Sequence, residues 1–123
     1  TVSARSDFSE SFMKSYKSAT KEELESYIKD IKKKGNKLIL SKSYIDVKNY
    51  KSIIKNYLKA VVDYTYILNK NIGFWENQYY STVETINEQL ESLTNELLSE
   101  EKENLDISST IDTIQGLLID IYK

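Results

Sequence analysis

The near absence of turn-forming residues limits what this chain can fold into. Its 123 residues include no proline and only three glycines. These two residues most often end helices and form the tight turns that join strands. A chain without them is expected to form a few long helices. Apolar residues make up 40% of the chain and charged residues 29%, which is typical of one folded domain rather than a disordered segment.

The spacing of the apolar residues supports this expectation. They recur at steps of three and four, which places them on one face of a helix that packs against other helices. The three regular stripes are Val47, Tyr50, Ile54, Tyr57, Val61, Tyr64 and Leu68; Tyr79, Val83, Ile86, Leu90, Leu93 and Leu97; and Ile107, Ile111, Ile114, Leu118 and Ile121. We predict a reversal of the chain at residues 69–73, with Gly73 as a C-terminal helix cap.

The N-terminal third is less regular. Residues 1–6 are small and polar and predict a flexible tether, so the domain is expected to cover residues 7–123. Two features predict helices here: the four-residue spacing of an aromatic stripe, and a capping box in which a Thr hydroxyl and a Glu carboxylate satisfy free amides. These features are Phe8, Phe12 and Tyr16, and Thr20 with Glu23.

Gly35 leaves the length of the second of these helices open. It either ends the helix or lies within it at a cost of about 1 kcal/mol relative to alanine. In both cases the sequence predicts an all-α fold, an antiparallel bundle of four to five helices with coiled-coil-like heptad seams. No apolar run approaches the roughly 20 residues that cross a membrane.

The side chains most used in catalysis are missing. The chain contains no histidine and no cysteine, which removes the commonest general base and the imidazole and thiolate ligands of metals. Neighbouring carboxylates such as Glu22 and Glu23 point about 100° apart on a helix. We therefore expect no catalytic residues, no cofactor and no metal, and a function other than that of an enzyme.

Charge divides the chain into two unlike halves. Residues 1–70 hold 15 basic and 8 acidic side chains, whereas residues 71–123 hold 2 and 11. One interpretation is that the halves fold together and their opposite charges flank the seams. The other is a basic patch for phosphate groups, although the patch lacks arginine, the residue best suited to phosphate, which argues against nucleic acid. Its residues are Lys29, Lys32, Lys33, Lys34, Lys37 and Lys42.

Aromatic residues suggest a second kind of surface. Three of the ten tyrosines, Tyr50, Tyr57 and Tyr64, lie one heptad apart, and we expect them at the edge of a seam with their hydroxyls reaching water. Further rings lie next to the predicted reversal, where a hairpin tip has few partners to cover them. We predict that they form a protein-binding surface, with Trp75 as its main residue. These candidates are Phe74, Trp75, Tyr79 and Tyr80.

Two resemblances extend this interpretation. The polar residues 1–6, the Lys-rich helices and the lack of Cys, Pro and His resemble the small all-helical surface lipoproteins of Borrelia-type spirochaetes. That resemblance implies a lipid anchor upstream of Thr1 and a surface that captures host proteins, complement regulators among them. The aromatic hairpin also resembles the WXG secretion substrates of Gram-positive bacteria, although Gly73-Phe74-Trp75 is not a Trp-x-Gly motif.

The expected function is thus a non-catalytic helical binding protein, exposed on the cell surface or secreted, that captures a host or partner protein. The alternatives are a cytoplasmic helical adaptor or regulator and a WXG-like secreted hairpin. The expected partner is a protein, contact with a membrane is expected only through the lipid anchor, and self-association is left open.

Overall fold

The computed structural model describes residues 2–68, 72–99 and 105–121, and in these ranges the regular structure is helical throughout. The helices are α1 (Val2–Ser41), α2 (Tyr44–Leu68), α3 (Ile72–Leu98) and α4 (Ser108–Asp120). The predicted all-α bundle is confirmed, with four helices.

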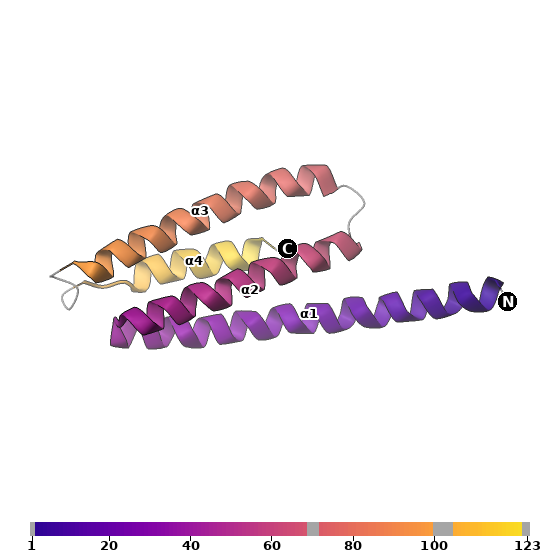
Figure 1. The fold of residues 1–123 in the computed structure, drawn as a ribbon, viewed down its shortest axis with the longest axis horizontal. Coiled ribbons are helices and arrows are strands. Elements are labelled where there is room, and N and C mark those ends of the chain that lie inside the picture. The colour runs from indigo at the N-terminus through magenta and orange to yellow at the C-terminus, as the bar shows by residue number, and fades with distance from the viewer. Residues whose placement is uncertain (1, 69–71, 100–104, 122–123) are drawn as a thin grey trace.

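Successive helices run in opposite directions, up and down the length of the molecule (Figure 1). Each helix packs on the next one along the chain, and α4 also packs on α1, which closes the bundle. The N-terminal part of α1 extends past the ends of the other three helices (Figure 1). None of the helices, over the ranges given above, is long and apolar enough to cross a membrane.

The heptad stripes form the core. On α1 the fully buried residues Leu24, Ile31 and Leu38 are seven residues apart. Each side chain of this size contributes roughly 1.5 to 3 kcal/mol when it is removed from water. The other helices contribute the buried members of the predicted stripes, which are Val47, Tyr50, Ile54, Tyr57 and Val61 on α2; Tyr79, Ile86, Leu90, Leu93 and Leu97 on α3; and Ile107, Ile111, Ile114, Leu118 and Ile121 at α4.

Gly35 is where α1 comes closest to its neighbours. The helix continues through this residue, which is buried. A Cβ atom at this position would lie 3.0 Å from Ile111 Cγ2 and 3.3 Å from Tyr50 Cε1. Gly35 therefore neither ends nor breaks the helix: it provides the space that α2 and α4 occupy.

Two tyrosines lie deeper than the sequence predicts. Tyr50 and Tyr57 are fully buried rather than at the edge of the seam, and Tyr64 is half-buried. The Tyr57 hydroxyl donates to the backbone carbonyl of Leu118, 2.5 Å away, and its ring meets Tyr27 edge-on. The Tyr57 hydroxyl does not need to reach water because the carbonyl of Leu118 accepts its hydrogen bond. The Tyr50 ring lies in the space beside Gly35.

The N-terminal third differs from the prediction in its boundaries. α1 is one helix from Val2 to Ser41, so residues 2–6 are helical rather than an irregular tether, and Thr20 does not cap a new helix. That residues 1–6 are flexible stays a prediction, because Thr1 lies outside the described residues. Helix propensity carries α1 across residues 17–23, where the apolar stripe is interrupted.

The predicted reversal at residues 69–73 falls mostly outside the described residues. α2 ends at Leu68 and α3 begins at Ile72. Gly73 lies inside the first turn of α3 and is not a C-terminal cap of α2. An isolated glycine next to asparagines indicated a helix end, but here it is tolerated at a helix start.

Candidate functional site

The turn between α1 and α2 is built from a short series of hydrogen bonds. α1 ends at Ser41, and Lys42 adopts a left-handed conformation with a φ of 48°. Its amide donates to the carbonyl oxygen of Leu38 at 2.8 Å, which is the usual way to close a helix C-terminus. Ser43 then caps α2, since its hydroxyl accepts the amide hydrogen of Asp46 at 3.2 Å.

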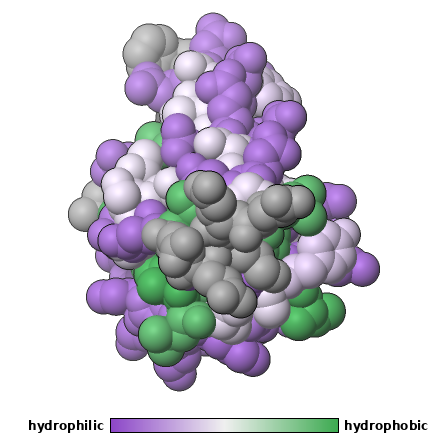
Figure 2. All heavy atoms as spheres, turned by 90° about the vertical axis from the view of Figure 1, so that its left-hand side faces the viewer, coloured by the Kyte–Doolittle hydropathy of each residue, from purple (hydrophilic) through white to green (hydrophobic). Residues whose placement is uncertain are grey.

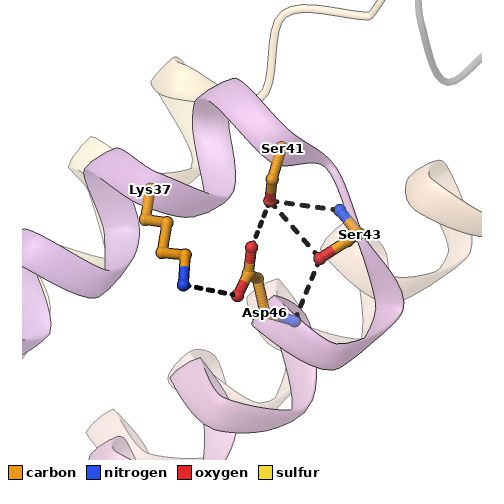
Figure 3. A network of polar contacts seen from close by, with 4 residues as sticks. All are labelled: Lys37, Ser41, Ser43 and Asp46. Atoms are coloured by element: carbon orange, nitrogen blue, oxygen red, sulfur yellow. Dashed lines mark hydrogen bonds and ion pairs between the residues drawn. The ribbon is translucent and has the colours of Figure 1, made fainter.

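Asp46 joins the two helices across this turn (Figure 3). Its side chain is almost fully buried, accepts a hydrogen bond from the Ser41 hydroxyl and forms an ion pair with Lys37 at 3.6 Å. The Ser41 hydrogen bond and, to a smaller degree, Ser43 and Lys37 lower the pKa of this carboxyl below its usual value, against the effect of burial. The turn is therefore held in one conformation while Asp46 is ionised.

This rigid turn presents large apolar side chains to solvent. Leu40 is 87% exposed, Tyr44 67% and Ile45 59%. Leu98, at the end of α3, is 67% exposed, and with Tyr44 it lines a small cavity of about 80 Å³. We call these four residues the end patch. Figure 2 looks onto this end of the bundle and shows apolar side chains reaching its surface at several points.

A second apolar feature lies along the side of the bundle, between α2 and α3. It is a groove of about 860 Å³, which we call the α2–α3 groove. Its apolar side chains come from the edges of the two heptad stripes, where the helices do not fill the space between them. They are Ile54, Leu58 and Val62 of α2 and Tyr79, Val83 and Leu90 of α3.

Charged side chains line the two edges of the α2–α3 groove. On α2 they are Lys51, Lys55 and Lys59, four residues apart, followed by Asp63, and on α3 Glu91. Glu84 is exposed and lies one heptad before Glu91, hence at nearly the same angle around α3. The groove thus has a mainly basic edge on α2, with Asp63 near the C-terminal end of that helix, and an acidic edge on α3.

The opposite charges of the two halves flank the groove between α2 and α3 without pairing across it. Lysines lie on the α2 side and Glu91 on the α3 side, and no ion pair joins the described parts of these two helices. The ion pair that the structure defines is Lys37 with Asp46, and both belong to the basic half. That opposite charges stabilise a common seam within the chain stays a prediction.

The predicted aromatic surface near the reversal is only partly exposed. Tyr79 is buried and donates a hydrogen bond to the carbonyl of Leu58 at 3.2 Å. Trp75 is half-buried and stacks on Tyr79, with ring centroids 4.8 Å apart. Tyr80 is 65% exposed. The side chain of Phe74 lies outside the described residues.

The physical reason is that α3 begins at Ile72, before these rings. A helix that starts there turns Trp75 and Tyr79 toward α2, where they can stack on each other, whereas we expected rings next to the reversal to have few partners to cover them. That this aromatic surface binds a protein stays a prediction. Among the described residues, the surface now consists of Tyr80 and the exposed part of Trp75.

The predicted basic patch is spread around α1. Lys29, Lys33 and Lys37 follow one line along the helix, while Lys32 and Lys34 point to either side of it. These five lysines are exposed, and Lys37 pairs with Asp46. Lys42, the sixth residue of the predicted patch, is half-buried in the turn between α1 and α2. Their charges do not converge on one point, and whether they bind phosphate stays a prediction.

The surfaces described above are largely apolar and suited to contact with another molecule. Among the described residues, no group of three or more carboxylates is arranged to hold a metal ion. Asp46, the carboxyl with the most partners, faces two serines and a lysine inside a turn that is already satisfied. What the arrangement can do is bury the end patch or the α2–α3 groove against another molecule.

Sequence reasoning missed the α1–α2 turn. The signal was present: Ser43 and Asp46 have the spacing of a helix N-cap and the third helical residue. Leu40, Tyr44 and Ile45 could also have been noticed, because they fall outside the heptad stripes on both sides of this cap. Apolar residues that fit no stripe are the ones that a bundle leaves exposed.

Comparison with known proteins places the chain among bacterial relatives. Bacillus subtilis YaaR is 29% identical over 104 residues, which cover 82% of this chain and 71% of YaaR. A crystal structure of protein TM1646 from Thermotoga maritima matches with a TM-score of 0.81 and 24% identity over 94% of this chain and 97% of that chain. A crystal structure of protein BH1478 from Bacillus halodurans matches with a TM-score of 0.78 and 25% identity over the same shares.

These findings correct the resemblance to spirochaete surface lipoproteins. That resemblance rested on composition, which unrelated chains can share. The sequence model of the family described as "Protein of unknown function (DUF327)" instead matches residues 1–122. The chain belongs to the DUF327 family.

Proposed function

We propose that this protein is a non-catalytic binding module that recognises a partner protein through the end patch. The observation behind the proposal is that Leu40, Tyr44 and Ile45 are more than half exposed on a turn whose backbone is fixed by Asp46. Large apolar side chains exposed at the same end of the bundle favour a protein contact.

Rigidity is the second support. A side chain on a mobile loop loses conformational freedom when it binds, at a cost of roughly 0.5 to 1.5 kcal/mol each. The Asp46 contacts hold the backbone of the turn before any partner arrives. Tyr44 can then act as an aromatic anchor, the type of residue that contributes most to protein interfaces.

The proposal retains part of the expectation from the sequence. Binding of a protein, without catalysis, remains the function we favour. Display on the cell surface and capture of a host protein depended on the lipoprotein resemblance, which is corrected, and the four-helix bundle differs from the two-helix hairpin of the WXG substrates. An adaptor or regulator that works through the end patch is the form of the proposal we retain.

Site-specific photo-crosslinking in the native cells tests the proposal. A photoreactive phenylalanine analogue replaces Tyr44 in one variant and Tyr80 in the other. The two positions are matched, because both are tyrosines on helices with nearly equal exposure, 67% and 65%. We expect a discrete protein adduct from position 44 and none from position 80.

Substitution then measures the contribution of the patch. Leu40→Asp and Ile45→Asp should each remove the adduct, because a charge would be buried unpaired at the interface. Both residues face solvent, so the free energy of unfolding should change by less than about 0.5 kcal/mol. An adduct from position 80 alone would move the site to the other end of the bundle, and no adduct from either would contradict the proposal.

A further inference from the structure

The α2–α3 groove has the features of an unfinished interface. Its apolar floor reaches into the core, since Ile54 and Leu90 are buried while Val62 and Val83 remain half-exposed. α2 and α3 are held together near the start of α3 by the Tyr79 hydrogen bond to Leu58. Away from that contact the two helices leave the groove open to solvent.

The charges along the two edges do not pair with each other in the part of the chain that the structure describes. α3 carries the exposed Glu84 and Glu91 and no basic residue, while α2 presents three lysines, Lys51, Lys55 and Lys59, and one carboxylate, Asp63. Over the parts of α2 and α3 that the structure describes, no ion pair links these lysines to the glutamates. Like charges along one helix repel, so each edge favours a partner of opposite charge.

We propose that a second copy of this chain covers the α2–α3 groove, forming a twofold symmetric dimer. A twofold axis parallel to the helices lays α2 of one copy over α3 of the other, and the same contact occurs twice. The basic edge of each copy then meets the acidic edge of its partner, and the two apolar floors face each other.

The register along the helices agrees with this pairing. α2 and α3 run in opposite directions (Figure 1), so Lys51 and Glu91 both lie toward the α1–α2 turn, and Lys59 and Glu84 both lie toward the other end. A twofold axis parallel to the helices keeps every residue at its own height. Lys51 of one copy therefore meets Glu91 of the other, and Lys59 meets Glu84.

Sedimentation of the purified chain is the first measurement. We expect a species of twice the 14.3 kDa monomer mass that dissociates as the salt concentration rises, because exposed charge pairs are screened by salt. A chain that stays monomeric across a dilution series at low salt would overturn the proposal.

Charge reversal tests which surfaces meet. Lys51→Glu with Lys59→Glu makes both edges of the groove acidic, and Glu84→Lys with Glu91→Lys makes both basic. Each double variant should dimerise at least about tenfold more weakly than the original chain, because like charges then face each other. A matched control for the first double variant, Lys32→Glu with Lys33→Glu on α1, makes the same change in net charge and should leave the dimer intact.

Mixing the two double variants separates association from folding. In a mixed dimer the acidic α2 of one copy faces the basic α3 of the other, and the remaining pair is unaltered. We expect the mixture to form a heterodimer although each variant alone is mainly monomeric. Repulsion between α2 and α3 inside one chain cannot be relieved by mixing, so a mixture that remains monomeric would overturn the proposal.

The N-terminal part of α1 from another copy is the competing occupant of the groove. Removal of residues 2–19 distinguishes the two, because the proposed contact involves α2 and α3 only. The shortened chain should keep the dimer and its salt dependence. Loss of the dimer in this variant, with helicity retained over the remaining residues, would assign the groove to that segment instead.

Discussion

Tyr50 and Tyr57 are one heptad apart and equally buried, yet their hydroxyls have different surroundings. The Tyr57 hydroxyl donates to the carbonyl of Leu118. The Tyr50 hydroxyl is buried with no hydrogen-bond partner among the described residues. Burial, and then the charge of Asp112, raises the pKa of Tyr50 far above its usual value. A buried polar group without a partner costs roughly 1 to 3 kcal/mol.

Replacing each tyrosine by phenylalanine should therefore have opposite effects. Tyr57→Phe should lower the free energy of unfolding by about 1 kcal/mol, because it removes a buried hydrogen bond. Tyr50→Phe should leave it unchanged or raise it by up to about 1 kcal/mol, because no bond is lost. Urea unfolding of the two variants checks this. A loss of stability in Tyr50→Phe as large as that in Tyr57→Phe would mean that Tyr50 has a partner.

For single residues, the sequence predicts which way a side chain faces better than how deeply it is buried. The heptad spacing correctly placed Tyr50 and Tyr57 toward the neighbouring helices. It could not show that both hydroxyls would be enclosed, because that depends on a gap made by Gly35 and on a carbonyl from α4. Both come from segments distant in the sequence.

At the scale of a helix, the two glycines Gly35 and Gly116 make a matched pair. Both lie inside helices, but a Cβ atom at Gly116 would have no neighbour within 4 Å, whereas one at Gly35 would lie 3.0 Å from Ile111. Alanine is favoured over glycine in a helix by about 1 kcal/mol. Alanine substitutions at the two sites therefore share the same gain in helix propensity and differ only in the packing of the added methyl group.

We expect Gly116→Ala to stabilise the protein by roughly 0.5 to 1 kcal/mol and Gly35→Ala to destabilise it. Ile111 is buried and branched next to the backbone, so it cannot easily move away. Thermal unfolding of both variants tests this. Equal stabilisation by the two substitutions would show that α4 shifts to accept the added methyl group.

The turn between α1 and α2 should respond to acid. The folded state lowers the pKa of Asp46, so its contribution to stability is present above the unfolded pKa of about 4 and is lost as the pH falls through the lower folded value. In urea unfolding between about pH 5 and pH 3, the original chain should lose stability more steeply than Asp46→Asn.

Asp106 serves as an internal reference in this measurement. Its pKa is also lowered, mainly by the Ser108 hydroxyl, and it is present in both proteins. Its effect therefore cancels in the comparison. If the two pH profiles were parallel, the ionised form of Asp46 would not be the one that holds the turn.

For whole elements, the sequence predicted α2, α3 and α4 from their stripes and missed the continuity of α1. A stripe repeated at steps of three and four stays on one face, whereas Phe8, Phe12 and Tyr16 at steps of four move steadily around the helix. From this pattern we predicted a separate short helix. The backbone nevertheless continues as one helix, as propensity alone allows.

For the molecule as a whole, the all-α class and the antiparallel order followed from the lack of proline and the three stripes. The candidate surfaces did not. The α2–α3 groove exists because two amphipathic helices are splayed, and the end patch because a turn is closed by Ser43 and Asp46. Periodicity reports which face is apolar, but not whether a neighbouring helix covers all of it.

The order in which helices pack also sets the path by which the chain can fold. α1 and α2 are joined by two residues and share the most extensive contact in the bundle, so closing their hairpin costs little loop entropy. Contact between α1 and α4, in contrast, joins segments from opposite ends of the chain. The α1–α2 hairpin is therefore expected to form in the transition state, and α4 to dock after it.

Rates of folding and unfolding can test this order with two small substitutions. Ile31→Val on α1 and Ile114→Val on α4 each remove one methyl group from a fully buried side chain, which should cost roughly 1 kcal/mol. The first should mainly slow folding and the second mainly speed unfolding. The reverse result would make α4 part of the nucleus. With the expected order, a chain whose α4 has detached would still keep its closed hairpin, and the face of α1 beside Gly35 would be briefly open to water.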